Sequence, residues 1–168
     1  QKSDSPLIVN RQKPTAPDPS ALDAFIKNKL TDEGAFLWSQ ASDEQVWTAI
    51  SNTDFVLSVG YQPVGAQNVS ERLHEINLNS ADWVNARKQV LDIILAEELK
   101  VTQGLSITDL IAYDVPDLPV LDVRITNPST ISVLRQSGLV RYAEPLSYEP
   151  FITTSANDRS DSGCGSNT

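Results

Sequence analysis

The sequence predicts an α+β domain in which helices cover one face of an antiparallel sheet. From residue 54 onward, segments rich in β-forming residues alternate with segments whose apolar residues recur at helical spacing, in the order β-α-(β)-β-α-β. The length of 168 residues suits one domain with a substantial core. A hydrophobic content of 40% and a charged content of 21% are typical of a globular chain rather than a disordered one.

The first 53 residues are expected to form an extended leader and a small helical extension. Four prolines among the first 20 residues favour an extended chain. Ser20 is a candidate N-cap for a helix over 21–30, which residues 31–34 are expected to end. A second short helix is predicted over 43–51. We expect these helices to pack as an accessory unit through four aromatic side chains: Phe25, Phe36, Trp38 and Trp47.

The first half of the predicted domain, 54–147, contains a buried strand over 55–61 and a long amphipathic helix over 81–99. Residues 64–79 between them are expected to form a loop with room for one helical turn. Residues 105–115 fit two structures equally: a helical turn that begins with a capping box at Ser106, or a strand.

The second half of the predicted domain again contains a strand followed by a helix. Residues 120–125 alternate between apolar and charged, which predicts a half-buried strand with Asp122 on its polar face. Asn127 and the proline after it favour a helix over 128–137, followed by a strand over 139–143. This is the ferredoxin-like split βαβ order, and the crossover rule places both core helices on one face. Residues 148–168 are expected to be a flexible tail or linker.

The composition argues against several classes of partner. A net charge of -9 is unfavourable for binding nucleic acid, which needs a basic surface. The apolar runs are far too short to span a membrane. No sequence motif indicates a cofactor, and zinc is disfavoured because Cys164 is the single cysteine and His74 the single histidine.

The search for catalytic motifs also finds nothing specific. His74 stands between two glutamates, which is typical of a surface residue, and no Gly-x-Ser-x-Gly elbow or phosphate-binding loop occurs. The acidic pair of Glu97 and Glu98 near the end of the long helix is expected to be solvated. The chain is therefore predicted not to be an enzyme, although a small enzyme that uses His74 is one alternative.

Residues 118–149 carry a more specific pattern. A strand ending at a small polar residue precedes a short helix with Ile131 and Leu134, and a closing strand contains Tyr142 and Glu144. This pattern resembles the C-terminal half of the propeptides of subtilisin-like serine peptidases, in particular the long propeptides of secreted bacterial enzymes. The order of elements agrees over residues 54–147, whereas the first 50 residues have no counterpart in the short members.

The resemblance implies an intramolecular chaperone and autoinhibitor with a cognate subtilisin-like catalytic domain as its partner. The sheet would lie on two enzyme helices, an acid after the last strand would cap their N-termini, and the following segment would enter the active-site cleft. The enzyme-binding residues would then be Tyr142, Glu144, Leu146, Ser147, Tyr148 and Glu149. Where the family often has a second acid, this chain has Leu146, and Pro145 intervenes.

The same resemblance implies a secreted, periplasmic or cell-surface location after removal of a signal peptide. The start at Gln1 without a methionine fits such processing, and it fits a trimmed chain equally well. Cys164 would pair with a cysteine of the catalytic domain. The alternative to a propeptide is a stand-alone ferredoxin-like domain that binds other proteins or inhibits peptidases.

Overall fold

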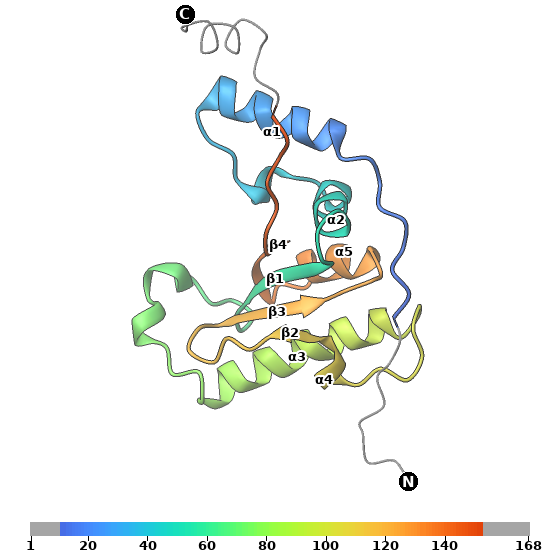
Figure 1. Cartoon of the computed structure of the whole chain (residues 1–168). Helices are drawn as coiled ribbons and strands as arrows, with labels where there is room; N and C mark the ends of the chain where they lie inside the picture. Colours follow the sequence, from blue (N-terminus) through green and yellow to red (C-terminus); the bar gives the residue numbers. More distant parts are fainter. Residues whose placement is uncertain (1–10, 153–168) are drawn as a thin grey trace, which may run out of the picture.

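The computed structural model describes residues 11–152, and its centre is an open antiparallel sheet of four strands (Figure 1). The strands are β1 (Val56–Tyr61), β2 (Ile111–Tyr113), β3 (Val120–Arg124) and β4 (Val140–Pro145). They lie in the order β2-β3-β1-β4, so that β1 pairs with both β3 and β4 while β2 and β4 form the edges. The predicted α+β class is therefore confirmed.

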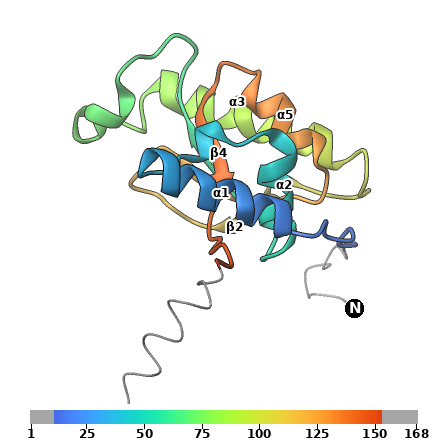
Figure 2. The same ribbon diagram turned by 90° about the horizontal axis from the view of Figure 1, so that it is seen from above.

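Two helices lie where the helical spacing of apolar residues predicted them, one after β1 and one after β3. They are α3 (Ala81–Glu98) and α5 (Ser129–Arg135). α3 packs against β1, α5 packs against β4, and the two helices also contact each other. Figure 2 shows them side by side. Two helices in mutual contact cannot lie on opposite faces of one sheet, so both cover the same face.

The connections between these elements resolve two open questions. The segment 105–115 contains both predicted structures, because α4 (Ile107–Leu110) leads directly into β2. The capping box at Ser106 is formed with Asp109. The loop between β1 and α3 holds two 3-10 turns, η2 (Val69–Glu71) and η3 (Leu73–Glu75), where one helical turn was expected.

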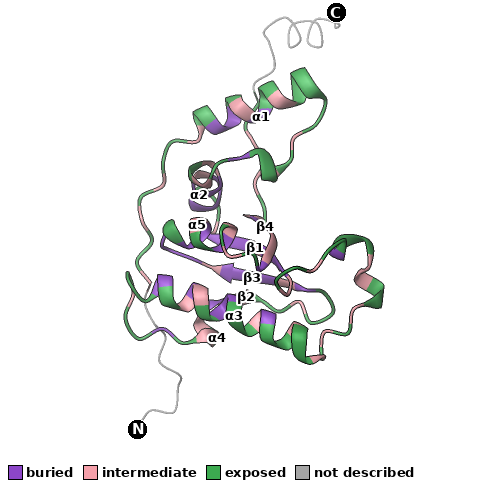
Figure 3. Cartoon of the chain, turned by 180° about the vertical axis from the view of Figure 1, so that it is seen from behind, coloured by how far each residue is buried: buried purple, intermediate pink, exposed green. Residues whose placement is uncertain are grey.

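The inward-facing side chains of the sheet and the helices form one apolar cluster. Figure 3 shows the buried residues concentrated in the strands and on the inner sides of the helices. Leu121, Val123 and Ile125 are buried as the alternation of strand 120–125 predicted. The cluster also contains residues of the other strands and helices, including Leu57, Val59, Val90, Ile94, Leu134 and Ala143.

The N-terminal helices differ from the prediction in two respects. α1 (Ser20–Glu33) continues through residues 31–33 and ends at Gly34, which has φ 78°. The predicted end of the helix at residue 30 was wrong because a helix tolerates the polar side chains of residues 31–33. Gly34, the last residue of the predicted break, ends the helix because its left-handed conformation favours glycine. Ser20 does not act as the N-cap either, because it is the first residue of the helix and Pro19 precedes it in the cap position. The N–H of Ser20 donates to the carboxylate of Asp18.

The predicted role of Trp47 in an accessory unit was also wrong. It lies on α2 (Asp43–Ser51), packs edge-on against Phe55, and belongs to the main cluster with Val46 and Ile50. Phe25, Phe36 and Trp38 pack on a second, smaller cluster of Leu22, Ile26 and Ala49, and Phe36 and Trp38 also contact the main cluster. α2 thus belongs to the core of the sheet. Helix α1 and η1 (Trp38–Gln40), which border the small cluster, are called the N-terminal unit below.

Glu97 and Glu98 were both expected to be solvated, but Glu97 is buried with an exposed fraction of 9%, and Glu98 is fully buried. Its carboxylate accepts hydrogen bonds from the N–H groups of Thr126 and Asn127, at 2.7 and 3.2 Å, and from the Thr130 hydroxyl at 2.6 Å. The guanidinium of Arg11 pairs with the same carboxylate at 2.7 Å. Glu98 therefore connects the end of α3 to the start of α5 and to Arg11 in the segment before α1, and helical periodicity gives no sign of such a contact.

Candidate functional site

The sheet presents a second row of side chains on the face opposite to α3 and α5. Successive residues of a strand point to opposite faces, so Ser58 and Gly60 lie in this row when Leu57 and Val59 face the core. In the neighbouring strands, Ser58 pairs with Asp122 and with Glu144, and Gly60 pairs with Tyr142. The row therefore contains Tyr142 and Glu144, two of the residues proposed from the sequence.

Tyr142 lies across the backbone of β1. A Cβ atom added to Gly60 would come within 2.7 Å of the Tyr142 ring carbon Cζ, so only glycine leaves room for the ring. The guanidinium of Arg141 lies 5.2 Å from the centre of the same ring. Burial raises the pKa of the Tyr142 hydroxyl, and the positive charge of Arg141 partly opposes that effect.

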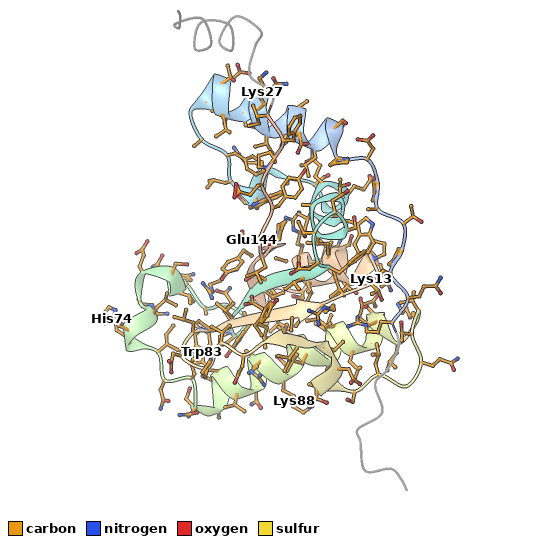
Figure 4. All side chains as sticks on the ribbon, viewed as in Figure 1. Lys13, Lys27, His74, Trp83, Lys88 and Glu144 are labelled. Atoms are coloured by element: carbon orange, nitrogen blue, oxygen red, sulfur yellow. The ribbon has the colours of Figure 1, made fainter. Side chains whose placement is uncertain are left out.

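Glu144 lies near the end of β4, where the chain leaves the sheet (Figure 4). Its side chain is half-buried, and burial raises the pKa of its carboxyl, while the nearby charge of Arg135 acts in the opposite direction. A carboxylate in this position is incompletely solvated and would gain from added hydrogen-bond donors. The N–H groups of a helix N-terminus are donors of this kind.

Asp122 is a third polar residue of this row, and the sequence analysis did not propose it as a site residue. The alternation placed Asp122 on the polar face correctly, yet only 7% of the residue is exposed. Within the described chain its Oδ1 atom is buried and has no hydrogen-bond partner. Unpaired buried carboxylate oxygens are uncommon. Alternation predicts a face and cannot predict this burial, which depends on the neighbouring strands.

The segment after β4 contains the other proposed residues. The N–H of Leu146 donates to the carbonyl of Val56 at 3.3 Å. Beyond that bond, no backbone hydrogen bond joins residues 147–152 to another part of the described chain. Leu146, Ser147 and Glu149 are exposed, and Phe151 has an exposed fraction of 75%. The backbone and most side chains of this segment are thus accessible to a partner.

Tyr148 is the exception within this segment. Its ring packs edge-on against Trp38, with 6.0 Å between ring centres, and its hydroxyl donates a hydrogen bond to Asp23 of α1. Burial, together with the bond to Asp23 and the negative charge there, raises the pKa of Tyr148. The chain bends at Leu146 and Ser147 before it reaches Tyr148.

Arg135 connects the sheet row to the N-terminal unit. Its guanidinium donates to the carbonyl of Ala41 at 2.8 Å and to the carboxylate of Asp43 at 3.0 Å. It also donates to the carbonyls of Trp38 and Ala143, at 3.2 and 3.3 Å. One side chain of α5 therefore binds η1, the start of α2 and the edge strand β4, immediately beside Glu144.

The remaining candidate residues lie elsewhere. His74 is on η3, with 80% of its side chain exposed, and Figure 4 shows it on the outer side of its loop, far from Glu144. Its nearest charged neighbour is Glu75, at 3.6 Å. Cys164 lies outside the described residues. Residues 11–152 contain no cluster of three or more His, Cys, Asp or Glu side chains suited to a metal ion.

A cavity of about 460 Å³, separate from the row of Tyr142 and Glu144, is lined by residues of α3 and of the strands β2 and β3. Its lining is mainly apolar and includes Leu91, Ile107 and Ile111, with Arg87 and Lys88 at its border. Lys88 is paired with Asp92 at 2.8 Å. None of the residues proposed from the sequence contributes to this cavity.

Comparison with known proteins adds no assignment. No family model matches the chain, and neither curated proteins nor solved structures give a significant match. Among the described residues, no helix is both long and apolar enough to cross a membrane. The function must therefore be argued from the sheet row, from the segment that follows it and from the pattern of residues 118–149.

Proposed function

We propose that this chain is the propeptide of a secreted subtilisin-like serine peptidase, which it helps to fold and then inhibits. The observation that carries the proposal is the course of the chain after Glu144. Glu144, a half-buried acid, lies near the end of the edge strand β4. Residues 147–152 follow shortly after it, and their backbone makes no backbone hydrogen bond within the described chain. An inhibitor that binds like a product needs both features side by side.

The arrangement of elements supports the ferredoxin-like split βαβ topology on which this proposal depends. The strand order β2-β3-β1-β4 is the order expected for two interleaved βαβ units. All recorded strand pairs are antiparallel, and α3 and α5 share one face. The opposite face, with the half-buried side chains of Tyr142 and Glu144, is then the surface available for two helices of the peptidase.

Each part of this surface has a defined task in the proposed complex. Glu144 accepts hydrogen bonds from the N-termini of the enzyme helices, and the positive end of their dipoles stabilises its charge. Tyr142 provides apolar contact area beside it. Leu146, Ser147, Tyr148 and Glu149 form the segment whose backbone pairs with the enzyme cleft as an added strand, while the side chain of Tyr148 keeps its contacts with Trp38 and Asp23.

The proposal also covers the remaining expectations. The chain has no catalytic activity of its own, and its location is outside the cytoplasm. Cys164 pairs with a cysteine of the catalytic domain. The enzyme alternative is tested by His74→Ala, which on this proposal leaves every assayed function unchanged.

The direct test is inhibition of purified bacterial subtilisins by the isolated chain, with a trypsin-like peptidase as a control for specificity. Glu144→Ala should raise the inhibition constant between a few-fold and about thirtyfold, as expected when a carboxylate at helix N-termini is removed. Glu75→Ala, which removes an exposed acid on η3, should leave the constant unchanged.

If the chain inhibited none of these subtilisins at micromolar concentration, the propeptide proposal would fail. The stand-alone ferredoxin-like interaction domain would then be the better description. An inhibition constant unaffected by Glu144→Ala would remove this acid from the mechanism.

A further inference from the structure

A row of aromatic side chains joins α1 to the segment after β4. Phe25 of α1 contacts Phe36 edge-on at 6.0 Å, and Phe36 contacts Trp38 at 4.9 Å. The row ends with the contact between Trp38 and Tyr148 at 6.0 Å. Edge-to-face pairs of this kind contribute about 0.5–1.5 kcal/mol each beyond the area they bury. The aromatic row therefore fixes one point of the C-terminal segment on the N-terminal unit.

The hydroxyl of Tyr148 makes this attachment specific. It donates to Asp23, a residue of α1 with an exposed fraction of only 9%. Asp23 would otherwise be a buried acid, which is costly without a donor. Both the ring and the hydroxyl of Tyr148 are thus used within the chain, and neither is free for another protein.

The neighbours of Tyr148 have the opposite character. Ser147 and Glu149 are exposed on either side of it, and Phe151 is more exposed still, at 75%. The backbone N–H and C=O groups of residues 147–152 make no backbone hydrogen bond within the described chain. The segment is therefore attached through one side chain, while its backbone and its other side chains remain accessible.

We infer that α1 and η1 form an anchor for Tyr148 that positions residues 147–152 for pairing with a strand of a partner protein. This inference rests on the proposed function, in which the partner strand belongs to the substrate-binding cleft of the peptidase. It also narrows that proposal. Tyr148 is a positioning residue that stays on its own chain, and Leu146, Ser147, Glu149 and Phe151 supply the side chains that reach the enzyme.

The advantage of an anchor is entropic. A free segment loses backbone and side-chain freedom when it enters a cleft, and a segment that is already positioned loses less. Release of the anchor should weaken inhibition by about tenfold, which corresponds to the ordering of one or two side chains. The effect requires no contact between the anchor and the enzyme, so α1 can act at a distance from the cleft.

The test compares Tyr148→Ala and Tyr148→Phe with Tyr113→Ala, which removes a half-exposed tyrosine of β2. Backbone order parameters of Ser147, Glu149 and Phe151 are measured by NMR on the full free chain. The inhibition constant is measured against a purified bacterial subtilisin. We expect Tyr148→Ala to lower the order parameters of these three residues and to weaken inhibition about tenfold, Tyr148→Phe to have an intermediate effect, and Tyr113→Ala to have none.

Two results would overturn the inference. Order parameters that do not change in Tyr148→Ala would show that Tyr148 does not position the segment, whatever happens to inhibition. Order parameters that fall without any change of the inhibition constant would show that positioning does not matter for binding. The order parameters could also fall in Tyr148→Ala while even the unaltered chain inhibits no subtilisin. The anchor on α1 and η1 would then be supported, and the proposed function would be contradicted.

Discussion

The sheet with its two helices and the unit formed by α1 and η1 are stabilised in different ways. The sheet, α2, α3 and α5 share one large cluster of buried apolar side chains, to which the buried carboxylate of Glu98 adds a set of internal hydrogen bonds. The N-terminal unit has only Leu22 and Ile26 of α1, with Ala49 of α2, in its buried cluster. Its other contacts are the aromatic row, the bond from Tyr148 to Asp23 and the bonds from Arg135 to the carbonyls of Trp38 and Ala41. Phe36 and Trp38 also pack against the main cluster.

This difference indicates a division of tasks. A large cluster stabilises a fold by itself, because the stabilisation grows with the apolar area removed from water. The small cluster of α1 depends on α2, which is itself part of the core. Helix α1 therefore adds little to the stability of the sheet, and its contact with the segment after β4 is better explained by positioning.

The largest expected effect is the loss of the carboxylate of Glu98. Glu98→Ala would leave the Arg11 guanidinium and the N–H groups of Thr126 and Asn127 without their buried acceptor. Removing one member of such a buried network costs roughly 3–5 kcal/mol. Urea unfolding followed by circular dichroism should show this loss for the whole domain.

Glu75→Ala is the matched control for that measurement, since 57% of the Glu75 side chain is exposed. Its effect should stay within about 0.5 kcal/mol, as for other surface substitutions. If the two variants had equal stability, Glu98 would not be the connection between α3 and α5 described above.

A second pair of variants compares the two regions directly. Ile94→Ala removes a fully buried side chain of the main cluster, and Ile26→Ala removes one with an exposed fraction of 3% in the small cluster. The first should lower the free energy of unfolding of the whole domain by about 2–5 kcal/mol. Ile26→Ala should mainly promote local unfolding of α1. Amide hydrogen exchange should then accelerate in Ser20–Glu33 and stay slow in β1 and β3.

Exchange that accelerated equally in α1 and in the sheet of Ile26→Ala would contradict the division of tasks. The two regions would then unfold together, and the N-terminal unit would have to be counted as part of the core.

A smaller effect is expected from the protonation of Glu144. Burial raises the pKa of this carboxyl above its ordinary value of 4.5, while the charge of Arg135 opposes the shift, so Glu144 is protonated more readily in the folded chain than in the unfolded chain. The destabilisation by the ionised form is present above the raised pKa and disappears as the pH falls below 4.5. Relative to Glu144→Gln, the wild-type chain should therefore gain stability when the pH is lowered from 7 to 4.

Enzyme binding should have the opposite pH dependence, because helix N-termini favour the ionised carboxylate. Inhibition by the wild-type chain should strengthen a few-fold as the pH rises through the raised pKa of Glu144, by comparison with Glu144→Gln measured on the same enzyme. If both chains had the same pH profile, Glu144 would not bind helix N-termini.

Most of the fold could be predicted from the sequence, because apolar periodicity reports which face of an element is buried. Helix α2 and strand β1 lie within one residue of their predicted positions, and the alternation of strand 120–125 identified its buried face. The burial of Glu98 could not be predicted in this way. It depends on a pairing between residues about 30 positions apart, and one polar residue in a helix has no periodicity.

The candidate site was predictable only in part, for the same reason. Tyr142 and Glu144 lie on one strand, and their place near its end followed from the closing pattern of the domain. The unpaired oxygen of Asp122 and the attachment of Tyr148 to Asp23 involve contacts between separate elements. No pattern in the sequence signals the second contact.

The central claim is that the segment after β4 enters the cleft of a subtilisin. It is tested most directly by the inhibition constants of two truncated chains, one ending at Pro145 and one ending at Ile152, against the same purified bacterial subtilisin. Both chains keep β4, so both should retain the sheet. We predict that the chain ending at Ile152 inhibits as strongly as the full chain and that the chain ending at Pro145 loses most of its inhibition. Equal inhibition by the two truncated chains would contradict the claim.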